Sequence, residues 1–156
     1  MSSQEFPALN DLPILELFRL EVETQSAILR QELLAALGSG PSGTHRLEEL
    51  MRASHSIKGA AQIVSRISAV RVAHTMEDCF SAAQDNATSL PPRTIDILLR
   101  GVDLLGCISK IPDASIARWE EEHKAEIEAF LASLPLKDNS GKPGGVAYGE
   151  SSNRCS

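Results

Sequence analysis

The chain has 156 residues, of which 42% are hydrophobic and only 4% are aromatic, and its formal net charge is −6. This length supports one domain with a core of its own and a tail, and the composition is typical of a helical bundle built on Leu, Ile, Val and Ala. The acidic balance and the lack of a polybasic segment or long apolar run argue against two classes of partner, so we expect neither nucleic acid nor a membrane.

The stretch Met1–Glu5 lacks the charged region and the apolar run of a secretory signal. The three cysteines lack Cys-x-x-Cys spacing, so they do not indicate a zinc knuckle. We therefore expect a cytoplasmic protein.

The first predicted element is a helix that begins after Asp11 as N-cap, has Pro13 in its first turn and ends at about Leu37. Its apolar residues recur at helical spacing: Leu15, Phe18, Val22, Ile28 or Leu29, and Leu33. The run Gly38–Gly43, rich in glycine and serine, ends this helix. A second helix is predicted over about Thr44–Val64.

Three more helices are predicted after a short turn. The third covers about Ser68–Asp85, with Ser68 as its N-cap. A pair of prolines opens the fourth, over about Pro91–Ile111. A single fifth helix, capped by Asp113, is predicted to stop before Pro135.

The sequence thus predicts an all-α fold, an antiparallel four-helix bundle with an additional fifth helix. We place the bundle at residues 11–135, after an N-terminal extension of residues 1–10. From Leu136 the composition changes to Lys, Gly, Ser, Asn and Pro, so we expect residues 136–156 to be a disordered tail or linker. The bundle alone is expected to be monomeric.

His55 is predicted to lie at the edge of the apolar face of the second helix. At about 3.6 residues per turn, that face consists of Leu47, Leu50, Ser54, Ile57, Ala61 and Val64. Lys58 follows one turn later, where its ammonium can reach a group attached to the imidazole. Gly59 costs about 1 kcal/mol relative to alanine inside a helix, and either room for an incoming group or close helix packing could be its purpose. Gln62 shares the side of the helix that carries His55.

The third helix carries His74 and Glu77 beside its own apolar face. That face consists of Val70, Ala73, Met76, Phe80 and Ala83. If the second and third helices form an antiparallel hairpin, Glu77 can face His55 across the seam. A carboxylate that accepts a hydrogen bond from Nδ1–H leaves the lone pair on Nε2 and raises the basicity of that nitrogen. These residues indicate that His55 accepts a phosphoryl group.

Two short runs resemble the histidine phosphotransfer (HPt) family. His55-Ser56-Ile57-Lys58-Gly59 is similar to the signature around the phosphorylated histidine of that family. Ala73-His74-Thr75-Met76-Glu77 is similar to the next helix in the N-terminal phosphotransfer domain of CheA-type chemosensory kinases. The resemblance covers about residues 9–134 and implies an HPt-like bundle. Within the family, residues 69–74 and 100–105 are similar to a hybrid kinase of the Wsp surface-sensing type.

The resemblance implies a phosphoryl relay in a two-component or chemosensory system. A separate CheA-type kinase domain would transfer the γ-phosphoryl group of ATP to His55. An aspartate of a response-regulator receiver domain, which binds Mg²⁺, would then take it. The resemblance further implies that Lys58 stabilises charge on the phosphoryl oxygens, that Glu77 orients His55, and that His74 extends the network.

The helices contain no glycine-rich phosphate cradle, so the domain alone is expected to have no ATP-dependent activity and no cofactor, although it would form part of a protein-histidine kinase. Gly59 and Gln62 are expected to lie on the surface that binds the partner domains. The sequence departs from many relatives in the turn after the second helix, where Ser65 and Arg66 stand in place of a glycine. That departure leaves the geometry of the turn open.

Two other functions compete with the relay. In a metal-binding bundle, His55, His74 and Glu77 would supply three ligands. Dinuclear carboxylate sites, however, need a glutamate from each of several helices and paired Glu-x-x-His motifs, which the sequence lacks, so we expect no metal. In a non-catalytic adaptor, the second and third helices would bind a partner and His55 would be incidental.

Overall fold

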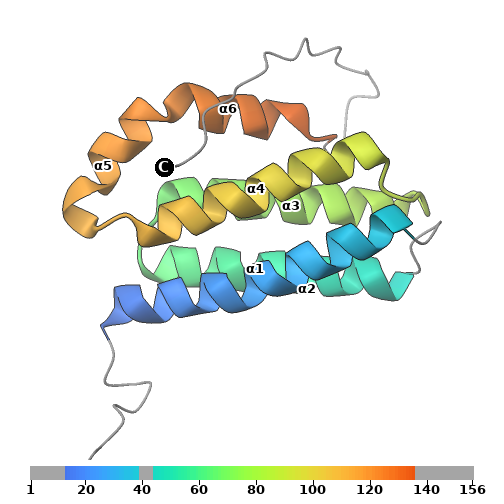
Figure 1. The fold of residues 1–156 in the computed structure, drawn as a ribbon, viewed down its shortest axis with the longest axis horizontal. Helices are drawn as coiled ribbons and strands as arrows, with labels where there is room; N and C mark the ends of the chain where they lie inside the picture. The colour runs from blue at the N-terminus through green and yellow to red at the C-terminus, as the bar shows by residue number, and fades with distance from the viewer. Residues whose placement is uncertain (1–12, 39–43, 136–156) are drawn as a thin grey trace, which may run out of the picture.

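The computed structural model describes residues 13–38 and 44–135, and the regular elements in that part of the chain are all helices. Figure 1 shows α1 (Ile14–Gly38), α2 (Thr44–Ile63), α3 (Ile67–Asp85), α4 (Pro92–Lys110), α5 (Asp113–Glu122) and α6 (Lys124–Ser133). The predicted cap Asp11, the extension of residues 1–10 and the tail of residues 136–156 lie outside the described residues. None of the helices just named has the length and apolarity that a membrane crossing needs.

The first four helices form an antiparallel bundle in which each helix packs on two neighbours (Figure 1). Helix α2 packs against α1 and most extensively against α3, and α4 closes the ring by packing on both α1 and α3. Helix α6 packs on α3 and α4, and α5 lies beside it. The predicted all-α four-helix bundle is therefore confirmed.

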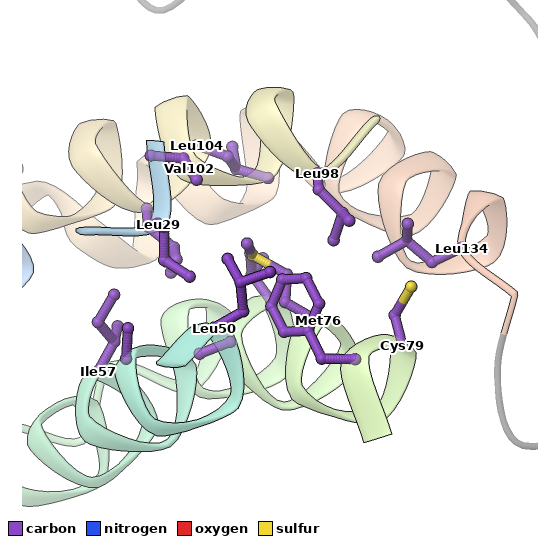
Figure 2. Close-up of a cluster of buried hydrophobic side chains, with 14 of the residues drawn as sticks. Leu29, Leu50, Ile57, Met76, Cys79, Leu98, Val102, Leu104 and Leu134 are labelled. Carbon is purple, nitrogen blue, oxygen red and sulfur yellow. The ribbon is translucent and has the colours of Figure 1, made fainter. Parts of the chain in front are cut away.

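The core of the bundle is mainly aliphatic, as Figure 2 shows for side chains that converge from all four helices. Leu50 and Ile57 lie two turns apart on α2 and are both fully buried. Burial of a side chain of this size contributes about 1.5–3 kcal/mol. At about 100° per residue, His55 lies roughly opposite Ile57 on the helix. Because Leu50 and Ile57 are buried in the core, His55 faces outward.

Helix α3 begins one residue earlier than predicted, and its predicted N-cap is wrong. The helix begins at Ile67 after Arg66, which makes no side-chain capping bond. Ser68 is instead buried in the first turn, where its backbone N–H donates to Oε2 of Glu120 at 3.1 Å. A carboxylate from α5 therefore satisfies an amide that a capping side chain would otherwise satisfy.

The single fifth helix predicted from Asp113 is also wrong, because it is divided at His123 into α5 and α6. Nδ1 of His123 lies 2.8 Å from the carbonyl oxygen of Trp119, which also accepts the backbone N–H of His123 at 2.9 Å. The two rings stack with their centroids 4.2 Å apart. Helix α5 has no buried residue, whereas the bend allows α6 to bury Ile127 and Phe130.

Helix α2 ends in a Schellman motif, which forms the turn to α3. The backbone N–H of Arg66 donates to Ala61 O at 2.9 Å, and that of Ser65 donates to Gln62 O at 3.2 Å. Ser65 has a φ of 58°, in the left-handed region that favours glycine. The turn whose geometry the sequence left open therefore has a glycine-type backbone at Ser65.

Arg66 fastens this turn to the connection between α4 and α5, which lies at the same end of the bundle. Its side chain is only 1% exposed, and it donates to Ile108 O and to Oδ1 of Asp113, both at 2.9 Å. The hairpin of α2 and α3 is thereby fixed to the end of α4 and the start of α5. These contacts of Arg66 therefore hold the hairpin that carries the candidate site against the rest of the bundle.

Candidate functional site

The antiparallel packing of α2 and α3 brings His55 and Glu77 together. Nδ1 of His55 lies 3.2 Å from Oε1 of Glu77, across the seam between the two helices. Nζ of Lys58 lies 2.8 Å from Oε2 of the same carboxylate. The contact expected between the imidazole and this acid is present, and each carboxylate oxygen faces one nitrogen.

Exposure differs sharply among these three side chains. The side chain of His55 is 69% exposed, whereas those of Lys58 and Glu77 are 17% and 20% exposed. The ring is farther from the core than the edge position that helical spacing predicted. A partner molecule can thus reach the imidazole while the acid and the lysine stay partly covered.

The ionisation of Glu77 reflects its two contacts. Desolvation by burial raises the pKa of this carboxyl, but the contacts with Lys58 and then with His55 lower it by more, so the net shift is below the ordinary value of 4.5. Glu77 is therefore an anion at neutral pH. An anionic acceptor favours the Nδ1–H tautomer of the imidazole.

This tautomer decides which nitrogen of His55 can react. With Nδ1–H donated to Glu77, the lone pair is on Nε2 at the other side of the ring. No contact of Nε2 is found among the residues that the structure describes. The arrangement can therefore present an exposed, oriented nucleophile beside a lysine whose charge can pair with an incoming anion.

Gly59 lies one turn after His55 and faces open space. A Cβ built on it would have no neighbouring atom within 4 Å. Close packing between helices is therefore not the reason for this glycine. Gln62 is exposed on the same side, so both residues expected on a binding surface are accessible there.

His74 is not brought into contact with His55. Its Nε2 lies 3.3 Å from Oδ2 of Asp78, the next acid on α3, and its side chain is 56% exposed. The network expected to extend through His74 therefore stops at Glu77. Because His74 is turned to Asp78, the three-ligand set considered for a metal is not assembled, and the described part of the chain has no group of three His, Cys, Asp or Glu residues placed to hold a metal ion.

Sequence reasoning missed a second set of polar residues beside the histidine. Oγ of Ser56 donates to Oε1 of Glu21 on α1 at 2.7 Å, and Nε2 of Gln25 donates to the same oxygen at 2.9 Å. Ser56 was visible as part of the motif. Its partner was not, because α1 carries several acids at similar spacing and nothing in the sequence distinguishes Glu21 from them.

Comparison with known proteins agrees with this geometry. The family model described as "Hpt domain" matches residues 13–133 of the chain. A protein named chemotaxis protein CheA, from Borreliella burgdorferi strain B31, is 25% identical over 97 residues, which is 62% of this chain. The matched region is only 11% of that relative, so this chain corresponds to a small part of it. No solved structure matches the chain.

Proposed function

Because the chain belongs to the Hpt domain family and is thus a histidine phosphotransfer module of two-component signalling, we propose that His55 is its phosphoryl acceptor. In the first step, Nε2 attacks the γ-phosphorus of ATP bound to a CheA-type kinase domain. The N–P bond forms, the bond to the bridging oxygen breaks, and ADP leaves. In the second step, a carboxylate oxygen of a receiver-domain aspartate attacks the same phosphorus, and the N–P bond breaks.

One observation carries the proposal: the solvent-exposed imidazole of His55 is hydrogen-bonded through Nδ1 to the half-buried carboxylate of Glu77. His55 is 69% exposed, and Glu77 holds it at 3.2 Å. A histidine that served only the fold would have less need of such exposure. The acid also stabilises the cationic ring that exists while both nitrogens are bonded.

Lys58 supports the same chemistry. Its ammonium lies on Glu77 at 2.8 Å, within one helical turn of His55. A phosphoryl group on Nε2 brings negative oxygens to this part of the surface, and Lys58 is the cation beside them. We propose that it stabilises their charge.

A groove beside the site supports a protein partner. It measures about 480 Å³ between α1 and α2, and its lining includes Ile14, Leu20 and Ile63, which are all exposed. Exposed apolar surface of this kind is typical of places where another protein binds. We propose that the partner domains dock here, with ATP supplied on the kinase and Mg²⁺ on the receiver. The Wsp-type resemblance and the cytoplasmic location stay predictions.

Labelling with a CheA-type kinase domain and radioactive ATP tests the proposal. The wild-type chain should gain one acid-labile, alkali-stable phosphate, and His55→Gln should gain none while keeping its helical circular dichroism. His45→Gln is the matched control, since His45 is another exposed histidine on α2. Retained labelling of the His55 variant, or loss of labelling in the control, would falsify the assignment.

A further inference from the structure

A second carboxylate, that of Glu21 on α1, is hydrogen-bonded to α2 on the side that faces α1. Glu21 accepts two hydrogen bonds on Oε1, from Ser56 at 2.7 Å and from Gln25 at 2.9 Å. Gln25 lies one turn after Glu21 on α1, so the carboxylate is held by its own helix before it receives the bond from α2. Ser56 directly follows His55, so this contact is made at the level of the reactive ring.

The packing around His55 explains why α2 needs such a contact. Several of the neighbouring residues on the helix are small, namely Ala53, Ser54, Gly59, Ala60 and Ala61, although Ile57 among them is fully buried in the core. Small side chains fill little space between neighbouring helices, so a directional hydrogen bond beside them adds to the restraint on α2 that burial of Leu50 and Ile57 provides. The hydroxyl of Ser54 bonds to Leu50 O within α2 at 2.9 Å, so it provides no link to another helix.

We propose that Ser56 and Glu21 form a positioning pair, which fixes the rotation of α2 so that Nδ1 of His55 meets Glu77. This inference rests on the proposed function of His55. Side chains extend about 5–6 Å from a helix axis, so a rotation of about 10° moves the ring by about 1 Å. The Nδ1–Oε1 distance is already 3.2 Å, and a displacement of that size would break the contact.

The pair acts from one side of α2 and Glu77 from the other. Ser56 is bound to α1, whereas Lys58 and His55 are bound to α3. Another polar contact between α1 and α2 is that of Arg46 with Glu32, near the other end of α1. Ser56, which directly follows His55, is therefore a residue through which α1 can set the orientation of the ring.

Labelling by phosphoramidate, a small phosphoryl donor that needs no docking surface, tests the pair. In that reaction Nε2 attacks phosphorus, the P–N bond of the donor breaks and ammonia leaves. We expect Ser56→Ala to be labelled about 3- to 10-fold more slowly than wild type, since misplacement of about 1 Å costs up to about 100-fold. Ser56→Thr, which keeps a hydroxyl, should restore the rate.

Three further variants separate positioning from general loss of a serine or an acid. Ser26→Ala is the matched control, because Ser26 is a half-buried serine on α1 whose Oγ has no hydrogen-bond partner among the described residues. It should be labelled at the wild-type rate. Glu21→Gln keeps an oxygen that can accept from Ser56 and should be close to wild type, whereas Glu21→Leu should match Ser56→Ala.

The tautomer of His55, measured by ¹⁵N NMR, is the readout that a merely structural role would not change. Wild type and Ser56→Thr should hold the Nδ1–H form, and Ser56→Ala should show an increased share of Nε2–H. Equal rates and equal tautomer populations in Ser56→Ala and wild type would overturn the positioning pair and leave the relay intact. Failure of wild type itself to accept phosphate at His55 would instead overturn the proposed function.

Discussion

At the scale of single residues, Glu77 is the group on which the proposed phosphoryl chemistry of His55 depends. Its two oxygens face two different nitrogens, from His55 at 3.2 Å and from Lys58 at 2.8 Å. One contact selects the tautomer, and the other holds the lysine close to the ring. The carboxylate therefore prepares both the nucleophile and the cation that the transferred group would meet.

Replacement of Glu77 by glutamine should slow phosphorylation without preventing it. The amide oxygen of Glu77→Gln can still accept from Nδ1–H, but it lacks the charge that stabilises the cationic ring. We expect a loss of about 10- to 100-fold in labelling rate with phosphoramidate. Glu48→Gln, which changes an exposed acid on α2, is the control. Equal rates for the Glu77 variant and wild type would remove this acid from the mechanism.

The same substitution should change how stability depends on pH. Desolvation raises the pKa of Glu77, but the contacts with Lys58 and His55 lower it by a larger amount. The net pKa in the folded chain is therefore below 4.5. A lowered folded-state pKa adds stability above the unfolded value, and this stability is lost as the pH falls through the folded value. Melting temperatures should therefore show wild type above Glu77→Gln at pH 7, and this difference should disappear as the pH falls through the lowered folded-state pKa of Glu77.

Gly59 and Gly101 should respond in opposite ways to alanine. A Cβ on Gly59 meets no atom within 4 Å, so Gly59→Ala should gain about 1 kcal/mol of unfolding free energy from helix propensity. A Cβ on Gly101 would lie 2.6 Å from Cζ of Phe130, which is 8% exposed and has little room to move. Gly101→Ala should therefore destabilise the bundle by about 1 kcal/mol.

Denaturant unfolding measures both effects, and kinase assays add the functional half of the Gly59 prediction. If the glycine provides clearance, Gly59→Ala should slow transfer from a kinase domain while leaving labelling by phosphoramidate unchanged. A stabilised variant with unaltered transfer from the kinase would show that clearance is not its purpose.

At the scale of elements, helical spacing predicted α1 to α4 to within a few residues at the ends that the structure describes, because each has a continuous apolar face. The contact between His55 and Glu77 followed from the short turn, which forces α2 and α3 to be antiparallel. The bend at His123 did not follow, since it depends on a ring stacked on Trp119 and on two donors sharing one carbonyl oxygen. The bend is thus set by side-chain contacts four residues apart, whereas a contact between distant segments decided the partner of Ser56.

Two helix ends offer a test of backbone strain. Ser65 and Ala87 occupy the left-handed position of Schellman motifs, with φ of 58° and 50°. Left-handed backbone costs a residue with a Cβ about 1–2 kcal/mol, and substitution by glycine removes this cost. The greater flexibility of glycine in the unfolded chain offsets about 0.5–1 kcal/mol of the stability gained. Ser65→Gly and Ala87→Gly should each raise the free energy of unfolding by about 0.5 kcal/mol.

Chemical denaturation of the two glycine variants measures this gain, and Ser89→Gly provides a control at an exposed position for which no positive φ is found. A loss of stability in both Schellman variants would show that the left-handed backbone is not strained there.

At the scale of the whole molecule, the proposed reactive ring and the proposed docking groove lie on different seams of the bundle. The reactive ring is on the seam of α2 with α3, and the apolar groove is on the seam of α2 with α1. One helix, α2, supplies residues to both. A partner seated in the groove would therefore lie beside His55 without covering Glu77.

Ile63→Asp should separate these two parts. Ile63 is 69% exposed at the groove, so the substitution places a charge on apolar surface without emptying the core. We expect transfer from a kinase domain and to a receiver domain to fall about tenfold or more, with phosphoramidate labelling unchanged. The exposed Leu34, elsewhere on α1, gives the control Leu34→Asp. Equal transfer rates for the Ile63 variant and wild type would place docking elsewhere.

The position of the phosphoryl group on the imidazole tests the central claim most directly. Glu77 holds Nδ1, so the group must be on Nε2. We propose to phosphorylate uniformly ¹⁵N-labelled chain with a CheA-type kinase domain and to record the ³¹P–¹⁵N couplings of the product by NMR. We predict one phosphorylated residue, His55, with phosphorus bonded to Nε2. Phosphorus bonded to Nδ1, or found on another residue, would contradict it.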